Sequence, residues 1–357
     1  MQLIDRIKGS LLGGAVGDAL GAPIEFMSLA EIRSRFGSVG LLDYSEAYGR
    51  RGAVTDDTQM TLFTAEGLLR AWVRAQERGI CSTEGVIHHA YLRWLMTQNE
   101  RPIKSGLEIG TDGWLILTKA LHSRRAPGNT CLSALRASNG FGNPPVAHNN
   151  SKGCGGVMRV APIGLFASSI GGDQSVFEMA ANAASLTHGH PTGFLAAGHF
   201  AVIIAALLRD ASLPEALEAA TDQLNEHEHE QRSEVADAVA AAQELAARGR
   251  PQPEDIERLG GGWVAEEALA IAIACALTAR DFRDGVLLAA NHSGDSDSTA
   301  SIAGNLLGAQ FGRASIPQNW LHELEMHDEI DRLATDLYAI AAGEMSAEMA
   351  WDGYPGW

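Results

Sequence analysis

The chain has 357 residues, of which 46% are hydrophobic and 20% are charged, a composition that is ordinary for a globular protein and sufficient for a sizeable core. Lys and Arg number 27 against 44 Asp and Glu, so the formal net charge is -17, which argues against a broad nucleic-acid or anionic-membrane surface. The four cysteines form no Cys-x-x-Cys pair and therefore indicate neither a zinc site nor a disulfide framework.

The first predicted element is a helix over residues 3–20, where apolar residues recur at helical spacing. Asp18 interrupts this apolar stretch, so it fits neither a signal peptide nor a membrane span, and we expect a cytoplasmic protein. Glycine in a helix costs roughly 1 kcal/mol relative to Ala. We therefore expect close packing against another helix along the edge that carries Gly9, Gly13, Gly17 and Gly21.

Pro23 ends this helix and leaves Glu25 and Phe26 in a loop. A loop glutamate is most often a solvated surface residue. Its sequence context alone therefore assigns Glu25 no role.

A first acidic segment, Thr55, Asp56 and Asp57, stands at the start of a helix predicted over residues 57–78. Two adjacent aspartates in a first turn complement the helix macrodipole and are good capping residues. Capping alone is thus one interpretation of this segment.

The rest of the chain shows helical patterns and almost no strand pattern, so the predicted fold class is all-α. We expect one domain over residues 1–345 and an aromatic tail over residues 346–357 that docks on that domain. The further predicted helices span residues 83–97, 112–122, 130–138, 174–187, 192–209, 213–225, 231–248, 263–280, 283–291, 298–312 and 328–343.

A long loop over residues 139–156 is dense in glycine and asparagine. Loops of this length within compact domains are usually functional or disordered. Glycines would let backbone N–H groups approach a phosphate or a ribose, whereas the alternative is a flexible surface loop. Farther along, His188 and His190 stand two residues apart, a spacing that could suggest a transition-metal site.

A second acidic segment holds Asp295, Asp297 and Ser298, whose side chains can converge on one hard metal ion. Asp297 or Ser298 could instead simply cap the next helix. If both acidic segments meet, four carboxylates crowd one site, and each pair at ~4 Å repels by roughly 4 kcal/mol at an effective dielectric of 20. Two divalent ions would cancel the four charges, and paired metal ions are a recurring catalytic arrangement.

Taken together and in this order, the motifs of the chain resemble the ADP-ribosylglycohydrolase family, which includes the dinitrogenase reductase-activating glycohydrolase and the ADP-ribosylarginine hydrolases. The resemblance spans nearly the whole chain. The segments that carry it are residues 13–21, Glu25, residues 55–58, 153–159, 187–191 and 294–298.

The resemblance implies two divalent cations, Mg²⁺ or Mn²⁺, bound by side chains of both acidic segments. The ligands would be Thr55, Asp56, Asp57 and Asp297 for one ion, and Asp56, Asp295, Asp297 and Ser298 for the other. A serine stands at position 298 where some relatives have threonine, and both supply one hydroxyl oxygen. The implied catalytic residues are Glu25, Asp56 and Asp297, with Asp112 as a second choice for the proton-transferring carboxylate.

The resemblance also implies a substrate loop that contacts the diphosphate and the proximal ribose of ADP-ribose. It consists of Gly153, Cys154, Gly155, Gly156, Val157 and Met158, with His188 beside it. Arg159, next in the chain, could bind phosphate or could be a structural hydrogen-bond donor.

The implied activity is metal-dependent removal of ADP-ribose from modified protein side chains, above all from arginine, with immunity against an ADP-ribosyltransferase toxin as one setting for it. Two alternatives remain open at this point. One is hydrolysis of serine-linked ADP-ribose or of a related small conjugate. The other is a protein that binds ADP-ribose or a toxin without turnover.

Overall fold

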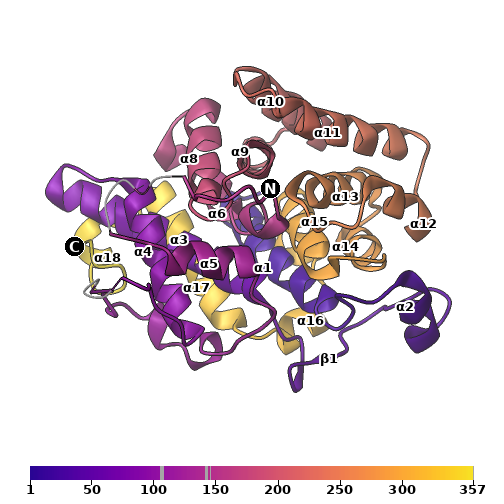
Figure 1. Cartoon of the computed structure of the whole chain (residues 1–357), viewed down its shortest axis with the longest axis horizontal. Coiled ribbons are helices and arrows are strands. Elements are labelled where there is room, and N and C mark those ends of the chain that lie inside the picture. The colour runs from indigo at the N-terminus through magenta and orange to yellow at the C-terminus, as the bar shows by residue number, and fades with distance from the viewer. Residues whose placement is uncertain (105–107, 141–143, 145, 357) are drawn as a thin grey trace.

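A computed structural model describes residues 1–104, 108–140, 144 and 146–356, and in this part of the chain nearly every regular element is a helix (Figure 1). This confirms the predicted all-α fold. The α-helices are α1 (Leu3–Gly21), α2 (Leu29–Phe36), α3 (Asp56–Arg78), α4 (Thr83–Thr97), α5 (Asn129–Arg136), α6 (Ala161–Leu165), α7 (Ala167–Ile170), α8 (Asp173–Ser185), α9 (Pro191–Leu208), α10 (Leu213–Asn225), α11 (Arg232–Ala247), α12 (Pro253–Ile256), α13 (Ala265–Thr278), α14 (Phe282–Ala290), α15 (Ser296–Phe311), α16 (Gln318–Glu323), α17 (His327–Ala341) and α18 (Ala347–Ala350).

The long helices agree with the predicted ranges to within two residues at either end, with one exception. The prediction of a helix over residues 112–122 was wrong, because this stretch forms only two short 3-10 turns, Leu115–Leu117 and Lys119–Leu121. Thr118 between them is extended, with ψ 111°, and Gly113 before them has φ +85°. Leu115 and Leu121 are buried there without a continuous helix, so apolar spacing alone was misleading.

The helices that the sequence did not predict have eight residues or fewer, which is too short for a periodic signal. One of them, α2, is preceded by the N-cap Ser28, whose hydroxyl accepts a hydrogen bond from the Glu31 amide in a capping box. Such short helices are set by local caps and by packing.

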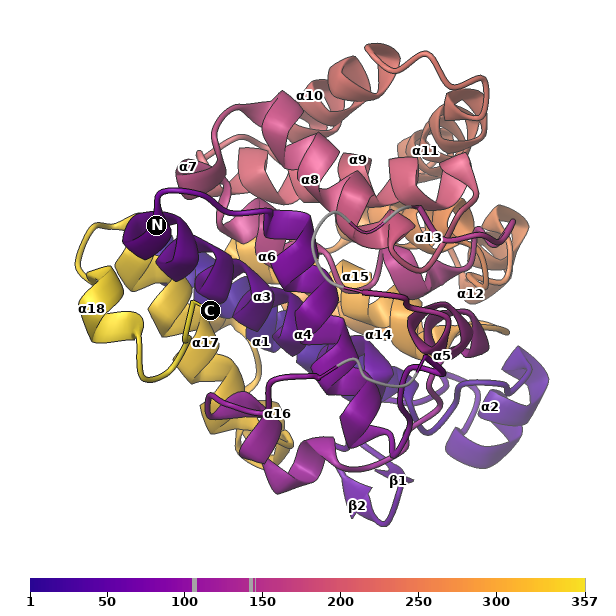
Figure 2. The same cartoon turned by 60° about the vertical axis from the view of Figure 1, so that its left-hand side comes forward.

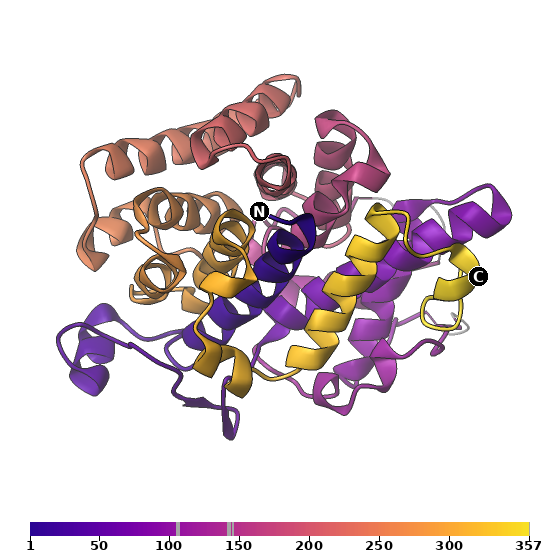
Figure 3. The same ribbon diagram turned by 180° about the vertical axis from the view of Figure 1, so that it is seen from behind.

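Helix α1 runs through the centre of the molecule and packs along its length against α15, with α17 on its other side (Figure 3). A Cβ atom added at Gly17 would collide with the carbonyl oxygen of Ala300, and one added at Gly13 would collide with that of Gly304. The expected close packing of the glycine edge is therefore confirmed, and its partner is the small-residue edge of α15. This contact joins helices that are far apart in the sequence.

Helices α8 to α13 form a second layer beside this central pair, and α10 and α11 lie outermost over α9 and α13 (Figures 1 and 2). Helix α9 is long and apolar enough to cross a membrane by composition alone. However, 83% of its span is buried, so it is a core helix.

The described residues contain one strand pair, the antiparallel hairpin of β1 (Glu46–Ala47) and β2 (Arg50–Arg51). Its turn residues Tyr48 and Gly49 both have positive φ, as tight hairpin turns require. The hairpin projects from the end of the molecule near α16 (Figure 2).

The described C-terminal residues up to 356 pack beside α3 (Figure 3). Tyr354 is buried and donates a hydrogen bond to Asp336 at 2.5 Å. The carbonyl oxygen of Pro355 accepts one from the guanidinium of Arg70, which also pairs with the buried Glu66. These contacts fix the aromatic tail to α3 and α17.

Candidate active site

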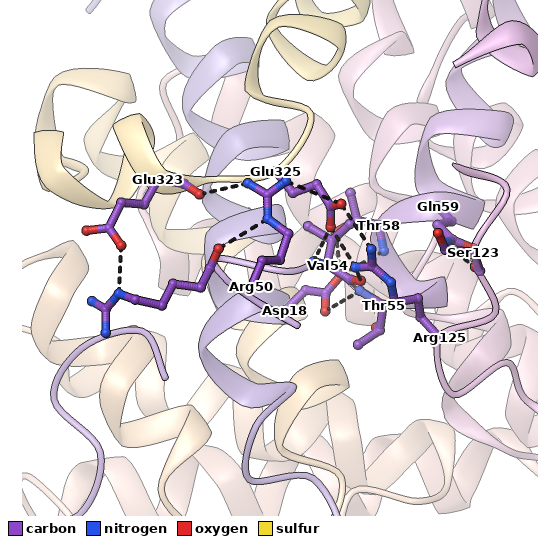
Figure 4. Close-up of polar contacts among 11 residues, drawn as sticks. Asp18, Arg50, Val54, Thr55, Thr58, Gln59, Ser123, Arg125, Glu323 and Glu325 are labelled. Carbon is purple, nitrogen blue, oxygen red and sulfur yellow. Dashed lines mark hydrogen bonds and ion pairs between the residues drawn. The ribbon is translucent and has the colours of Figure 1, made fainter. Parts of the chain in front are cut away.

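The first acidic segment is held by a carboxylate of α1. Asp18 is fully buried and accepts hydrogen bonds from the backbone amides of Thr55 at 3.0 Å and Thr58 at 3.1 Å, and from the Thr58 hydroxyl at 2.5 Å (Figure 4). Thr55 is the N-cap of α3, and its hydroxyl accepts a hydrogen bond from the Asp57 amide at 3.3 Å. The start of α3 is thus tied directly to the central helix.

A buried ion pair supports the same segment from the other side. Arg125 pairs with Glu325 through two contacts of 2.6 and 3.0 Å, and it also donates to the carbonyl oxygen of Val54 at 3.0 Å (Figure 4). The Glu325 carboxylate accepts a hydrogen bond from the Val54 amide at 3.2 Å. The amide of Asp56 donates to the Arg125 carbonyl at 3.2 Å. Residues 54–56 therefore have their backbone polar groups fixed on both sides.

The second acidic segment is held mainly by backbone contacts. Asp295, and not Asp297 or Ser298, is the N-cap of α15. Its amide donates to the carbonyl oxygen of Gly261 at 2.8 Å, and a Cβ atom at Gly294 would collide with that same oxygen. A Cβ atom at Gly21 would collide with the backbone of Asp297. The segment thus lies against the end of α1, as close as glycine permits.

The two segments meet at one cavity of about 520 Å³. The four aspartates are 2 to 4% exposed, so they lie at its inner end. Its lining consists of Glu25, Phe26, Asp56, Asp57, residues 126–131, Gly153, Cys154, Gly155, Met158, His188, Trp263, Asp295, Asp297 and Ser298.

Repulsion among the carboxylates is strong in this cavity. Oxygen atoms of Glu25, Asp295 and Asp297 lie within 4.8 Å of one another. Burial and the neighbouring carboxylates, first of all Asp297, raise the pKa of Glu25 to about 11. The same causes raise the pKa values of Asp56 and Asp295 well above their ordinary range. Such a cluster needs protons or cations to be stable.

The chemistry of the donor set fits divalent cations of the magnesium type. Glu25 Oε2 and Asp57 Oδ1 are buried and have no hydrogen-bond partner among the described residues, so each has a free lone pair. Carboxylate and hydroxyl oxygens are the ligands that hard cations such as Mg²⁺ and Mn²⁺ prefer. The residues present can therefore hold such ions.

Comparison with known proteins agrees with this geometry. A family model described as ADP-ribosylglycohydrolase matches residues 1–346. The chain belongs to the ADP-ribosylglycohydrolase family. One relative is ADP-ribosylhydrolase ARH3 of Bos taurus, which is 27% identical over 94% of this chain and 93% of that protein. Another is ADP-ribosylarginine hydrolase Tri1 of Serratia proteamaculans, which is 25% identical over 96% of this chain and 81% of that protein.

A solved structure extends the likeness of this family member to three dimensions. It is described as an ADP-ribosylglycohydrolase-related protein complex and matches with a TM-score of 0.64 at 27% identity. The match covers 95% of this chain and 99% of that chain. The arrangement of helices is thus that of the family.

Most residues of the predicted substrate loop lie at the cavity of this ADP-ribosylglycohydrolase-family protein. Gly153, Cys154, Gly155 and Met158 line it, and the Cys154 thiol donates to Asp295 at 2.8 Å. Gly156 and Val157 are buried and lie outside the described lining. Gly156 and Val157 could therefore act on a substrate in the cavity only through neighbouring residues. The predicted loop residues 141–143 and 145 lie outside the described part of the chain.

The two histidines do not form a metal pair. His188 lines the cavity, and its Nδ1 lies 2.8 Å from the Thr187 hydroxyl. Burial and the charge of Arg159 lower the pKa of His188 to about 3, so its ring is neutral near pH 7. His190 instead caps α9 by accepting from the Thr192 amide at 3.2 Å.

Arg159 and Asp112 each have a partner away from the cavity lining. Arg159 is fully buried and donates to the Ala183 carbonyl and the Thr187 hydroxyl, so it is a structural donor. Asp112 accepts from Arg70 at 3.0 Å. This placement favours Glu25 over Asp112 as the carboxylate that moves a proton.

Four side chains at or beside the site had no role predicted from the sequence: Asp18, Phe26, Tyr48 and Trp263. Asp18 was noted only as an interruption of an apolar helix, although a buried carboxylate in such a helix is a signal of a partner nearby. Tyr48, at the hairpin tip, has its pKa raised by burial and by the nearby carboxylate of Glu25. The run Gly260–Gly262 before Trp263 was the one signal for that residue.

Proposed function

We propose that this protein removes ADP-ribose from modified protein side chains, above all from arginine, with two divalent cations, Mg²⁺ or Mn²⁺, as cofactors. The observation that carries the proposal is the single cavity at which Glu25, both acidic segments and the glycine-rich loop meet. Such a cavity has the size of small-molecule sites in enzymes. An ADP-ribosylated protein is accordingly the partner that we propose.

The cation ligands would be the hydroxyl and carboxylate oxygens at the starts of α3 and α15. Thr55, Asp56, Asp57 and Asp297 would hold one ion, and Asp56, Asp295, Asp297 and Ser298 the other. When bound, such ions supply Lewis acidity toward ribose hydroxyls and a water of lowered pKa. Asp18 and the Arg125–Glu325 pair fix the backbone at the start of α3, and the contact between the Asp295 amide and the Gly261 carbonyl fixes it at the start of α15, so the ligands keep their places.

Glu25 is the residue that we assign to proton transfer. Its Oε2 atom is buried at the cavity without a hydrogen-bond partner among the described residues. Its raised pKa means that Glu25 holds a proton near pH 7 and can donate it. In this assignment Glu25 donates that proton to the nitrogen of the departing guanidine and later accepts one from the attacking water.

The loop from Gly153 to Met158 would bind the nucleotide part of the substrate. Glycines at positions 153 and 155 leave only narrow space beside the His188 ring, since an added Cβ atom would lie 3.4 and 3.0 Å from it. The neutral His188 can donate or accept a hydrogen bond to a ribose or phosphate oxygen. This arrangement orients the anomeric carbon toward the acidic inner end.

The arginine linkage is supported by two observations. One relative is named for arginine-linked ADP-ribose. The chain is also strongly acidic, which attracts a cationic guanidinium group. The test is release of ADP-ribose by the Mg²⁺-loaded full chain from arginine-modified and serine-modified protein side by side, with chelated enzyme as the control.

Faster release from the arginine linkage, lost in chelator, is the expected result. A clear preference for the serine-modified protein would show that the substrate linkage is the O-linked one and not the arginine linkage. Binding of ADP-ribose without release from either protein would show a binding protein instead. Full activity after rigorous metal removal would contradict the assigned cofactors.

A further inference from the structure

Two large aromatic side chains stand at the outer end of the candidate active site. Phe26 is 69% exposed and Trp263 is 41% exposed, whereas the aspartates that share their cavity are at most 4% exposed. The two rings are stacked, with centroids 5.4 Å apart and planes 18° from parallel. The site is therefore ordered by depth, with carboxylates inside and the pair Phe26 and Trp263, here termed the aromatic rim, outside.

Phe26 is held at the rim by an unusual backbone. It follows Glu25 in a turn closed by a hydrogen bond from the Met27 amide to the Ile24 carbonyl at 3.0 Å. Its φ is +68°, a conformation that bulky residues rarely adopt. Backbone strain of this kind is characteristic of functional sites. An exposed ring in a strained turn next to a site carboxylate is poorly explained by folding alone.

Trp263 is fixed to the same site from the opposite side. Its carbonyl oxygen accepts from the Cys154 amide at 3.2 Å, which joins it to the substrate loop. Two residues before it, the Gly261 carbonyl accepts from the Asp295 amide at 2.8 Å. The indole thus has a defined position relative to the second acidic segment.

The position of the rim determines what it can contact. A cavity of about 520 Å³ accommodates a nucleotide-sized group but not a folded protein. The side chain that carries ADP-ribose must therefore enter through the mouth, with its sugar toward the inner carboxylates. The end group of that side chain then lies beside the aromatic rim.

We propose that Phe26 and Trp263 form a subsite for a planar cationic leaving group, the guanidinium of arginine, which stacks on their rings. This inference rests on the proposed function and names residues that would determine its linkage specificity. Guanidinium groups stack well on indole and phenyl faces, because the ring quadrupole attracts the cation and both partners are flat. A serine oxygen has neither the charge nor the flat surface, so it gains nothing from the rim.

The first test compares substitutions that remove the ring with one that keeps it. Trp263→Leu and Phe26→Leu retain apolar volume without a π system, whereas Trp263→Phe retains a π face. In Mg²⁺-loaded full-length protein we expect the leucine variants to raise KM for an arginine-ADP-ribosylated peptide about tenfold, with kcat changed less than about twofold. We expect Trp263→Phe to stay close to wild type and turnover of a serine-linked peptide to be unaffected.

The second test measures binding without turnover. Calorimetry of agmatine with protein saturated by ADP-ribose should show binding that is weakened about tenfold in Trp263→Leu. The affinity for ADP-ribose alone should be the same in both proteins. Leu117→Ala, which removes a side chain that is 72% exposed and outside the cavity lining, is the control. Circular dichroism confirms that each variant is folded.

The outcomes separate this inference from the proposed function. Unchanged KM in both leucine variants together with unchanged agmatine affinity in Trp263→Leu would overturn the proposed subsite. A loss of ADP-ribose affinity in Trp263→Leu as large as the loss of agmatine affinity would overturn it as well. If wild type releases nothing from arginine, the proposed function fails. Agmatine binding that depends on Trp263 would then still support the guanidinium subsite, and absence of agmatine binding would overturn it too.

Discussion

The two acidic segments are held in place by different kinds of contact. At the start of α3, Asp18 and the Arg125–Glu325 pair hold residues 54–58 through buried side-chain hydrogen bonds. At the start of α15, the backbone itself is pressed against α1 and against the loop at Gly261. One half of the site is thus held mainly by polar side chains, whereas the other also depends on close backbone contacts that only glycine permits.

This difference predicts how each half fails. A polar support loses a few hydrogen bonds when one residue changes, and the helix start can shift locally. A backbone contact cannot yield, because a new Cβ atom meets main-chain atoms of a central helix. A side chain added at a glycine of the α1–α15 contact should therefore damage the whole fold, whereas loss of a polar support on the α3 side should mainly damage the site.

The largest effect is expected from Gly17→Val, because a side chain there would collide with the Ala300 carbonyl. We expect a loss of more than about 4 kcal/mol in the free energy of unfolding, or no folded protein at all. Urea unfolding followed by circular dichroism measures this. Gly172→Ala, at a position with nothing within 4 Å of the added atom, is the matched control. Near-normal stability of Gly17→Val would show that α1 and α15 can separate at little cost.

Removing one carboxylate charge from either segment should abolish turnover without unfolding the protein. Asp56→Asn and Asp297→Asn each remove the charge of a proposed cation ligand at nearly constant volume. We expect activity to fall more than about 100-fold, because changing a residue that only contacts a ligand already costs up to about 100-fold. Helical circular dichroism should be retained. Asp222→Asn, on the exposed face of α10, serves as the control. Loss of the fold in either variant would favour a purely capping role.

Glu325→Gln tests the polar support of the α3 half. It leaves the buried Arg125 without its charged partner, which we expect to cost about 3 kcal/mol of stability and about tenfold in Mg²⁺ affinity. Glu323→Gln is the matched control, since Glu323 pairs with the exposed Arg51. Glu323 lies farther than Glu325 from Asp18 and Thr55 (Figure 4). If Mg²⁺ affinity is unchanged while stability falls, the ion pair supports the fold and not the ligands.

Much of this architecture could be predicted from the sequence. Long helices have a periodic apolar pattern, and the glycine edge of residues 9–21 correctly indicated a close helix contact. The facing of that edge toward α15 could not be predicted, because nothing local encodes which helix is the partner. The false helix over residues 112–122 has the same origin, since burial of Leu115 and Leu121 is decided by tertiary contacts.

The site was predicted unevenly for a similar reason. Acidic residues at helix starts stand out in a sequence, so Asp56 and Asp297 were found and the structure brings them together. Asp18 supports them from a third helix, and its role depends on a contact across 37 residues. Trp263 reaches the cavity only because the preceding glycine run turns toward Asp295. Support and rim residues depend on three-dimensional proximity, which a local pattern does not contain.

The smallest effect concerns pH in protein stripped of metal by a chelator. Burial and the charge of Asp297 raise the pKa of Asp18 to about 7, well above that of an unfolded aspartate. Between these two values the folded state binds more protons than the unfolded state, so the free energy of unfolding falls as pH rises. We expect Asp18 alone to contribute a decrease on the order of 1 kcal/mol per pH unit below pH 7, measured by urea unfolding.

Asp18→Asn tests how much of this slope comes from Asp18 itself. The variant cannot bind the extra proton at position 18, so the slope below pH 7 should become shallower even though the absolute stability also changes. Saturating Mg²⁺ should flatten the slope in wild type, because cations replace protons in neutralising the cluster. An unchanged slope in Asp18→Asn would instead assign the protons to the other carboxylates of the cluster, Glu25, Asp56 and Asp295, whose pKa values are also raised. Asp18 would then act only as a hydrogen-bond acceptor that holds the start of α3.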